Sequence, residues 1–188
     1  RDIFPEDLPT GIPPNRGLQL SVFPLIADAT PLRTRQYRIS PAERAELDRQ
    51  VEYLESMGWA RPSTSPWAHP VTFANKGEGQ GLRCCVDLRN VNKMTKRNAA
   101  PIPRMDDLLD QVQGITVMSS LDLAAGYHQI PLLEEECERT AFHCGSRLME
   151  YTVMPFGSTN APAVFSAFMN EILKGYVGTF VLVYLDDV

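Results

Sequence analysis

The sequence predicts an α+β fold in which short strands, paired in hairpins, alternate with helices. Residues 70–74 and 82–88 have the strand-forming character expected on either side of a glycine-rich hairpin tip. Leu47, Val51 and Leu54 recur at helical spacing, so a helix that buries one stripe is expected there. The chain has 188 residues, which is enough to bury a substantial core.

The first helix is expected to follow a long extended segment. Residues 1–39 are rich in proline and lack periodicity, which favours extended structure. Ser40 and Glu43 are spaced as a capping box with Pro41 at the first helical position, so the helix is expected to begin there. Gly58 is expected to end it.

The middle of the chain is expected to alternate turns with short elements. A turn-rich stretch at residues 61–67 precedes the hairpin, and a short helix is expected at Arg104–Val112. After an acidic turn, residues 140–142 and 149–153 are expected to form strands.

The last helix is expected to follow the turn at residues 155–162, with Asn160 as its cap and Pro162 in its first turn. Its buried face is expected to contain Val164, Phe165, Phe168, Ile172 and Leu173. The other faces are small or polar, so either a bulky partner or the protein core could pack there.

Two adjacent carboxylates, Asp186 and Asp187, follow the apolar run Phe180–Val183, which predicts a buried strand that ends in a hairpin turn. Neighbouring carboxylates repel each other and are unfavourable at the end of an apolar strand unless a cation compensates them. The pair therefore indicates a site for a hard divalent metal ion.

Asp122 ends another strand-like run, residues 117–122, and supplies a third carboxylate. Two strands that end in Asp can lie side by side, and such a cluster could hold two Mg²⁺ ions about 4 Å apart, as in phosphoryl transfer. We therefore expect the side chains of Asp122 and Asp186 to converge. An Asp at the end of a strand can also be a simple turn former.

Four segments, in this order and spacing, resemble the reverse transcriptases of gypsy-type LTR retrotransposons (Metaviridae). They are residues 83–93 (RCCVDLRNVNK), 121–130 (LDLAAGYHQI), 153–165 (VMPFGSTNAPAVF) and 184–187 (YLDD). The resemblance implies an RNA-directed DNA polymerase, a nucleotidyltransferase with two Mg²⁺ ions (Mn²⁺ as a substitute). The metal ligands and catalytic residues would be Asp122, Asp186 and Asp187.

The resemblance also implies a nucleotide pocket. Lys76 and Arg83 would hold the triphosphate, and the tip that carries Lys76 would be a closing flap, although it could be only a flexible turn. Tyr127 would exclude a 2′-hydroxyl by its bulk, unless it is a core aromatic residue. Phe156 would pack at the same pocket.

Template and primer contacts are expected from Arg89, Asn160, Pro162 and Tyr184. The partners implied are an RNA template, a DNA primer or template and deoxynucleoside triphosphates, with a dimer of the full-length parent as one option. The rival function is a domesticated or decayed domain that binds RNA or protein as a non-catalytic scaffold, but a scaffold does not need three clustered acids.

The fold implied is the fingers and partial palm of a right-hand polymerase, with an antiparallel palm sheet. Residues 1–39 would be a connector, 40–104 the fingers, and 105–188 the palm with a fingers insertion near 132–153. The chain would be truncated at the catalytic hairpin, with thumb and RNase H parts absent. The segment alone is expected to lack processive synthesis and to bind nucleic acid weakly and in a salt-sensitive way.

The formal net charge is −5, but basic residues predominate at residues 83–104, which favours either a phosphate-binding surface or a solvated loop. No apolar stretch approaches the roughly 20 residues of a membrane span, and no signal peptide is visible. The four cysteines show no disulfide or zinc spacing and are expected to be reduced thiols. An intracellular location, in a cytoplasmic particle or the nucleus, is therefore expected. His69 and His128 are expected to be packing or surface residues.

Overall fold

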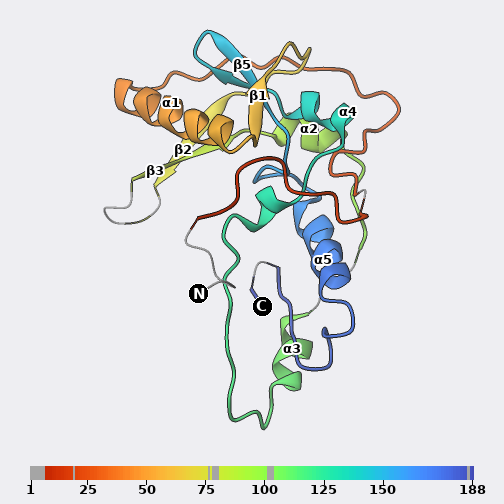
Figure 1. Cartoon of the computed structure of the whole chain (residues 1–188). Coiled ribbons are helices and arrows are strands. Elements are labelled where there is room, and N and C mark those ends of the chain that lie inside the picture. Colours follow the sequence, from red (N-terminus) through yellow and green to blue (C-terminus); the bar gives the residue numbers. More distant parts are fainter. Residues whose placement is uncertain (1–6, 19, 76, 78–80, 101–103, 186) are drawn as a thin grey trace.

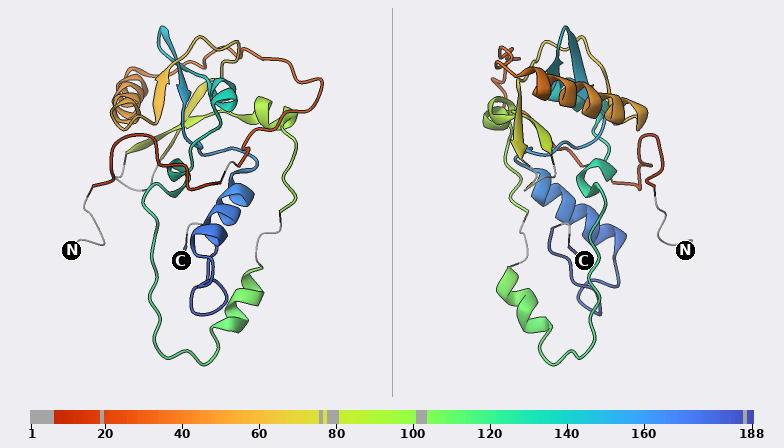
Figure 2. Two further views of the ribbon diagram at one scale, coloured as in Figure 1. Left: turned by 45° about the vertical axis from the view of Figure 1, so that its right-hand side comes forward. Right: turned by 90° about the vertical axis from the view of Figure 1, so that its left-hand side faces the viewer.

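The computed structural model describes residues 7–18, 20–75, 77, 81–100, 104–185 and 187–188. The strands gather with helix α1 (Pro41–Ser56) at one end of the molecule. Helix α5 (Ala161–Ile172) leads away from them, and helix α3 (Met105–Gln111) lies near the opposite end (Figures 1 and 2). Because the described strands pair in antiparallel sheets and are accompanied by helices, the predicted α+β class is confirmed.

Helix α1 begins at the predicted capping box. The Ser40 hydroxyl accepts a hydrogen bond from the backbone N–H of Glu43 (3.2 Å), and the Glu43 carboxylate accepts one from the backbone N–H of Ser40 (2.6 Å). Leu47 and Val51 are buried, and Gly58 adopts a φ of +71° just beyond the last turn. The predicted start and end are confirmed, and the predicted stripe is confirmed at Leu47 and Val51, whereas Leu54 is half-buried.

Strands β2 (Val71–Asn75) and β3 (Leu82–Val86) form the predicted hairpin. They pair antiparallel, with Val71 opposite Val86 at the base and Asn75 opposite Leu82 near the tip. Lys76 and residues 78–80, on which the flap hypothesis rests, lie outside the described residues.

A second antiparallel sheet has the strand order β1-β5-β4. Strands β4 (Phe142–Cys144) and β5 (Arg147–Tyr151) each lie two residues from the predicted position, and β1 (Ala60–Pro62) was expected to be a turn. Three residues are too few to show an alternating pattern, and Pro62 is tolerated because β1 is at the edge of the sheet. Residues 60–62 form a strand only because β5, distant in sequence, pairs with them.

Short helices were also missed by the sequence prediction. Helix α2 (Arg89–Met94), α4 (Glu134–Cys137) and the 3₁₀ turn η2 (Glu138–Thr140) have no side-chain cap at their N-termini. Without a capping residue or a full amphipathic period, such segments have no clear start signal in the sequence. Residues 89–94 of the basic segment, for which a solvated loop was one alternative, are thus helical.

Described residues of the connector, 7–39, contain no helix, but the connector contributes to the core. Val22 and Phe23 are fully buried, beside the buried carboxylate of Glu136. That carboxylate accepts hydrogen bonds from the Ser21 hydroxyl (2.5 Å) and from the backbone N–H groups of Val22 and Phe23 (2.9 Å each). The Arg139 guanidinium donates to the carbonyl of Phe23 (2.7 Å). The connector is therefore held by a buried polar cluster.

Helix α5 is buried on more than one face. Val164, Phe165 and Phe168 are buried as predicted, and Ala163 and Ser166 on its small or polar faces are buried too, which favours the core-packing alternative there. The predicted burial of Ile172 is wrong because the helix emerges from the core at its C-terminal end. Leu173 is half-buried.

The two runs expected to be palm strands do not form continuous ladders in the described part of the chain. Val117, Met118 and Phe180 are 85%, 72% and 75% exposed, so the expectation of buried strands is wrong for these positions. A strand requires partners for its backbone groups along its length. Here the described residues of the two runs make only isolated bridges, at Asp122, at Tyr184 and between Val181 and nearby Val177.

Candidate active site

Asp122 and Asp187 lie directly opposite each other in an antiparallel bridge. The neighbouring pair, Leu121 and Val188, exchanges both backbone hydrogen bonds, at 2.7 and 3.1 Å. Since hydrogen-bonded and non-hydrogen-bonded pairs alternate, Asp122 and Asp187 occupy a non-hydrogen-bonded pair, in which Cα atoms are about 4.5 Å apart and side chains are closest. The bridge therefore brings two carboxylates together on one face.

A tight turn carries Asp187 to this position. The backbone N–H of Tyr184 donates to the carbonyl of Asp187 (2.9 Å), and the N–H of Asp187 donates back to Tyr184 (3.1 Å). Leu185 adopts a φ of +54° at the tip. A left-handed conformation costs a non-glycine residue about 1–2 kcal/mol, so the surrounding pairing must hold the turn in place.

The carboxylates fit a divalent cation. Both residues are solvent-exposed, and in the described part of the chain neither carboxylate has an ion pair or hydrogen bond to a cationic side chain. Like charges directly opposite each other repel unless a cation is shared. Paired carboxylate oxygens are the ligands that Mg²⁺ prefers. Asp186 lies outside the described residues, so its predicted convergence with Asp122 stays a prediction.

An aromatic wall follows Asp122 in the chain. The 3₁₀ turn η1 (Gly126–Gln129) places the Tyr127 ring 5.0 Å from that of Phe156 and 5.2 Å from that of Phe165. Phe156 is 52% exposed, so the wall has an open side. The chain enters η1 through Ala125 in the left-handed conformation, and a Cβ at Gly126 would lie 3.1 Å from the Phe165 ring. The glycine thus permits close contact between η1 and α5.

His128, the next residue in η1, supports this wall. Its ring lies 4.9 Å from that of Trp59 and 5.3 Å from that of Phe156. Burial lowers the pKa of His128 to about 4, so the imidazole is neutral near pH 7. These contacts agree with the packing role predicted for His128.

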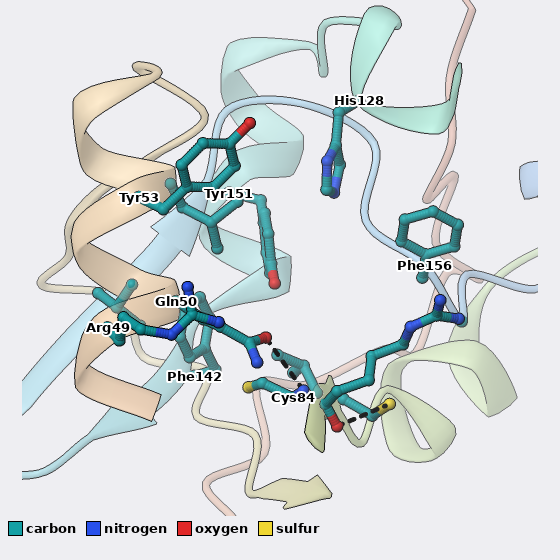
Figure 3. A pocket seen from close by; sticks show the side chains of 14 residues that line it. Arg49, Gln50, Tyr53, Cys84, His128, Phe142, Tyr151 and Phe156 are labelled. Atoms are coloured by element: carbon teal, nitrogen blue, oxygen red, sulfur yellow. Dashed lines mark hydrogen bonds between the residues drawn. The ribbon is translucent and has the colours of Figure 1, made fainter. Parts of the chain in front are cut away.

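Arg83 and Phe156 line one cleft of about 500 Å³ (Figure 3). Arg49, Gln50 and Tyr53 of α1 lie on one side of this cleft, and His128 and Phe156 lie on the other. The structure therefore places Arg83, one predicted triphosphate ligand, in the same cleft as Phe156, whereas Tyr127 does not line this cleft and reaches it only through its contact with the Phe156 ring. Lys76, the other predicted ligand, lies outside the described residues.

Arg89 lies on the surface at the start of α2. Its guanidinium makes two hydrogen bonds to the Asp87 carboxylate (2.8 and 2.6 Å), and the Tyr37 hydroxyl donates to the same carboxylate (3.0 Å). The Arg89 hydrogen bonds lower the pKa of Asp87 well below its usual range. Arg89 keeps an exposed side chain, and its template contact stays a prediction.

Asn160 packs inside the protein, although the sequence suggested a template contact. Its side chain is buried, donates to the carbonyls of Val22 (3.2 Å) and Lys96 (3.0 Å), and accepts from the backbone N–H of Asn98 (2.9 Å). It also makes no capping hydrogen bond to α5. Asn160 thus occupies the predicted N-cap position, but a side-chain cap is not formed, because the amide instead joins three chain segments. Its burial does not favour the predicted template contact, which stays a prediction.

The structure gives the positions of Pro162 and Tyr184 but does not test their predicted contacts with template or primer. Pro162 is in the first turn of α5, as expected, and is half-exposed. Tyr184 is half-buried at the base of the turn that carries Asp187. Template or primer contact by either residue stays a prediction.

A row of exposed side chains on the connector was missed by sequence reasoning. Arg33, Arg35 and Tyr37 are exposed, whereas the alternate residues Thr34 and Gln36 are half-buried and hydrogen-bonded. Such alternation is typical of an extended segment with one face packed. The pattern in residues 33–37 (RTRQY) could have revealed this face, and Arg38, where the alternation stops, is also exposed.

Among the described helices, none combines the length and apolar character needed to cross a bilayer. The cysteines, Cys84, Cys85, Cys137 and Cys144, are all unpaired. Burial raises the pKa of the Cys84 thiol to about 12, so this group is protonated near neutral pH.

Sequence comparisons point to one family. Residues 75–188 match the family described as "Reverse transcriptase (RNA-dependent DNA polymerase)". The chain is 36% identical over 163 residues to the retrovirus-related Pol polyprotein from transposon 297 of Drosophila melanogaster, a match that covers 85% of this chain and 15% of the polyprotein. It is 34% identical over 189 residues to the transposon Tf2-3 polyprotein of Schizosaccharomyces pombe, covering 100% of this chain and 14% of that polyprotein.

Solved structures agree with these matches. The foamy viral protease-reverse transcriptase in complex with RNA/DNA hybrid aligns with a TM-score of 0.74 and 24% identity, over 89% of this chain and 22% of that chain. The native prototype foamy virus protease-reverse transcriptase gives 0.70 and 29%, over 87% and 22%. The chain thus spans about 15% of the length of the curated relatives named here.

Proposed function

Because the chain belongs to the reverse transcriptase family, we propose that it supplies fingers (residues 40–104) and palm (105–188) to an RNA-directed DNA polymerase of a retrotransposon polyprotein. Its substrates would be deoxynucleoside triphosphates and a DNA primer on an RNA or DNA template. The observation that carries the proposal is the opposed pair Asp122 and Asp187, exposed and without a cationic partner in the described chain. Its action would be intracellular, where unpaired thiols persist.

We propose that Asp122 and Asp187, together with Asp186, hold divalent metal ions, two Mg²⁺ in the working enzyme or Mn²⁺ in their place. When bound, such ions favour deprotonation of the primer 3′-hydroxyl and stabilise charge on the triphosphate. The antiparallel bridge fixes the spacing of two of the ligands before any ion arrives. Two of the proposed ligands would therefore be preorganised by backbone pairing.

Arg83 and the aromatic wall would bind the nucleotide. The guanidinium of Arg83 can make paired hydrogen bonds to phosphate oxygens. Tyr127 would stand against the sugar, held in place by the rings of Phe156 and Phe165. Its bulk would exclude a 2′-hydroxyl.

Replacement of Tyr127 tests this steric role. In the protein expressed with its full natural reading frame, Tyr127→Ala should reduce discrimination against ribonucleotides on the order of 10–100-fold, because the space beside the sugar is opened. Single-nucleotide incorporation with matched deoxy- and ribonucleotides measures the effect. Tyr127→Phe retains the ring and should retain discrimination. Equal discrimination by wild type and Tyr127→Ala would make Tyr127 a core residue only.

The exposed Arg33 and Arg35, in the row with Tyr37, would bind phosphates of the nucleic acid. The double variant Arg33→Gln/Arg35→Gln should weaken binding to a primed RNA template, with the slope of log affinity against log salt reduced by about 1 for each lost contact. Fluorescence anisotropy over a salt series measures this slope. Lys174→Gln, at an exposed position beyond α5, is the control and should leave the slope unchanged. An unchanged slope in the double variant would exclude the row from the binding surface.

Primer extension tests the proposed function as a whole. With a primed RNA template, the protein in its full natural reading frame should extend the primer only when a divalent cation is present, and chelation should stop extension. Binding of the primed template without extension in Mg²⁺ or Mn²⁺ would favour the scaffold function instead.

A further inference from the structure

The ribbon β2–β3, which carries Arg83, consists of two strands in the described chain. An isolated hairpin is only marginally stable, and its outer edges have backbone groups without a strand partner. Backbone groups along β3 point alternately toward β2 and away from it. The Leu82 carbonyl and the Cys84 N–H bond to α1, so these two residues face away from β2 and Arg83 between them, opposite Ala74, faces it.

The Gln50 side chain of α1 satisfies these outward groups. Its Nε2 donates to the carbonyl of Leu82 (2.9 Å), and its Oε1 accepts from the backbone N–H of Cys84 (3.1 Å; Figure 3). One carboxamide thus forms a pair of hydrogen bonds across the edge of β3, as a neighbouring strand would. The two bonded residues are those that flank Arg83.

The orientation of the Gln50 amide is fixed by a second contact. Nε2 also donates to the Glu46 carboxylate (2.5 Å), which is itself bound by the Arg49 guanidinium at 2.6 and 2.8 Å. A flipped amide would direct its oxygen at both the Glu46 carboxylate and the Leu82 carbonyl, so only one orientation is favourable. Buried Leu47 and Val51 anchor the turns of α1 that carry Gln50.

We propose that Gln50 is a positioning residue: it holds β3 so that the Arg83 side chain already lies at the cleft before the triphosphate binds. This inference rests on the proposed function, in which Arg83 binds the nucleotide. A ribbon tied to α1 on both sides of Arg83 loses less freedom when the phosphate binds, and such preorganisation improves affinity. Without the amide, the N–H of Cys84 and the carbonyl of Leu82 lose their partner and β3 can move away from α1.

Gln36 provides a matched control on the other edge of the same ribbon. Its carboxamide donates to the carbonyl of Val71 (3.0 Å) and accepts from the N–H of Val71 (2.9 Å). The chemistry is the same, but Val71 is opposite Val86 at the base of the ribbon, three residues along from the pair that contains Arg83. Loss of Gln36 should loosen the ribbon without releasing the Arg83 segment.

The experiment compares Gln50→Leu and Gln36→Leu in the protein with its full natural reading frame. With saturating primed template, Gln50→Leu should raise the KM for the nucleotide about tenfold, equivalent to about 1.4 kcal/mol, with kcat nearly unchanged. Gln36→Leu should change neither constant. Hydrogen exchange of the Cys84 amide should be faster in Gln50→Leu and unchanged in Gln36→Leu. Gln50→Glu places a carboxylate next to the Glu46 carboxylate and the Leu82 carbonyl, so it should raise KM and speed Cys84 exchange as Gln50→Leu does.

A double-mutant cycle with Arg83→Gln shows whether Gln50 acts through Arg83. In the Arg83→Gln background, Gln50→Leu should have little further effect on KM. Equal rises in KM for Gln50→Leu and Gln36→Leu, or a full additional effect in the Arg83→Gln background, would overturn the inference. If the wild-type protein incorporated no nucleotide, the proposed function would be overturned. If hydrogen exchange of the Cys84 amide were unchanged in Gln50→Leu, the positioning role of Gln50 would be overturned whatever the activity.

Discussion

Asp122→Asn should reduce nucleotide incorporation by about 10³-fold while leaving the fold intact. The change removes the charge of one of two opposed carboxylates, and metal ligation contributes several kcal/mol of transition-state stabilisation. Asp122 is exposed and without a partner in the described chain, so unfolding free energy without metal should stay within about 0.5 kcal/mol of wild type. Single-turnover incorporation and urea denaturation measure the two effects.

The metal dependence of stability separates ligand loss from general damage. Millimolar Mn²⁺ should raise the melting temperature of the wild type, because a ligand that binds only the folded state stabilises it, and should not raise that of Asp122→Asn. Asp107→Asn, which neutralises an exposed acid on α3, serves as the control and should behave as wild type. If Asp122→Asn retained full activity and the Mn²⁺ response, Asp122 would be a turn former rather than a ligand.

Elements with local signals were predicted well from the sequence. Helix α1 has its own cap, stripe and terminal glycine, and each of these acts within a few residues. The hairpin of β2 and β3 has strand-forming residues around a glycine-rich tip. Such elements are specified by neighbours in sequence, so no tertiary partner was needed to predict them.

Elements that depend on distant partners were missed. Strand β1 exists because Ala60 and Arg61 pair with Tyr151 and Glu150, about ninety residues away in the chain. The same cause explains the exposed Val117 and Phe180: an apolar β-prone run predicts a strand, but only a neighbouring strand can make one. Sequence patterns report the tendency of a segment and do not report its partner.

At the site, the sequence predicted that two runs ending in Asp lie side by side, with Asp122 near Asp186. The structure pairs Asp122 with Asp187, and the predicted position of Asp186 stays a prediction. Asn160 was predicted to contact nucleic acid because it is a polar residue within a family motif, yet its amide is buried. A carboxamide suits either a ligand or a backbone clamp, and only the three-dimensional contacts distinguish the two.

Glu136→Ala should destabilise the protein by about 3–5 kcal/mol, the usual loss when one partner of a buried charged cluster is removed. Glu136 is only 1% exposed and accepts hydrogen bonds from Ser21, Val22 and Phe23. Without the carboxylate, two buried N–H groups lose their acceptor and Arg139 loses its counter-ion. The connector should then detach from the core, since these contacts join segments more than 110 residues apart in sequence.

Urea denaturation measures the loss, and limited proteolysis between residues 7 and 25 reports release of the connector. Glu135→Ala is the matched control, because Glu135 lies on the same short helix but is exposed, and its change should stay within about 0.5 kcal/mol. Glu136→Gln keeps the size but replaces one acceptor with a donor, so its effect should lie between the two. Equal stabilities for Glu136→Ala and Glu135→Ala would mean that the buried apolar contacts of Val22 and Phe23 hold the connector and that the carboxylate cluster adds nothing to them.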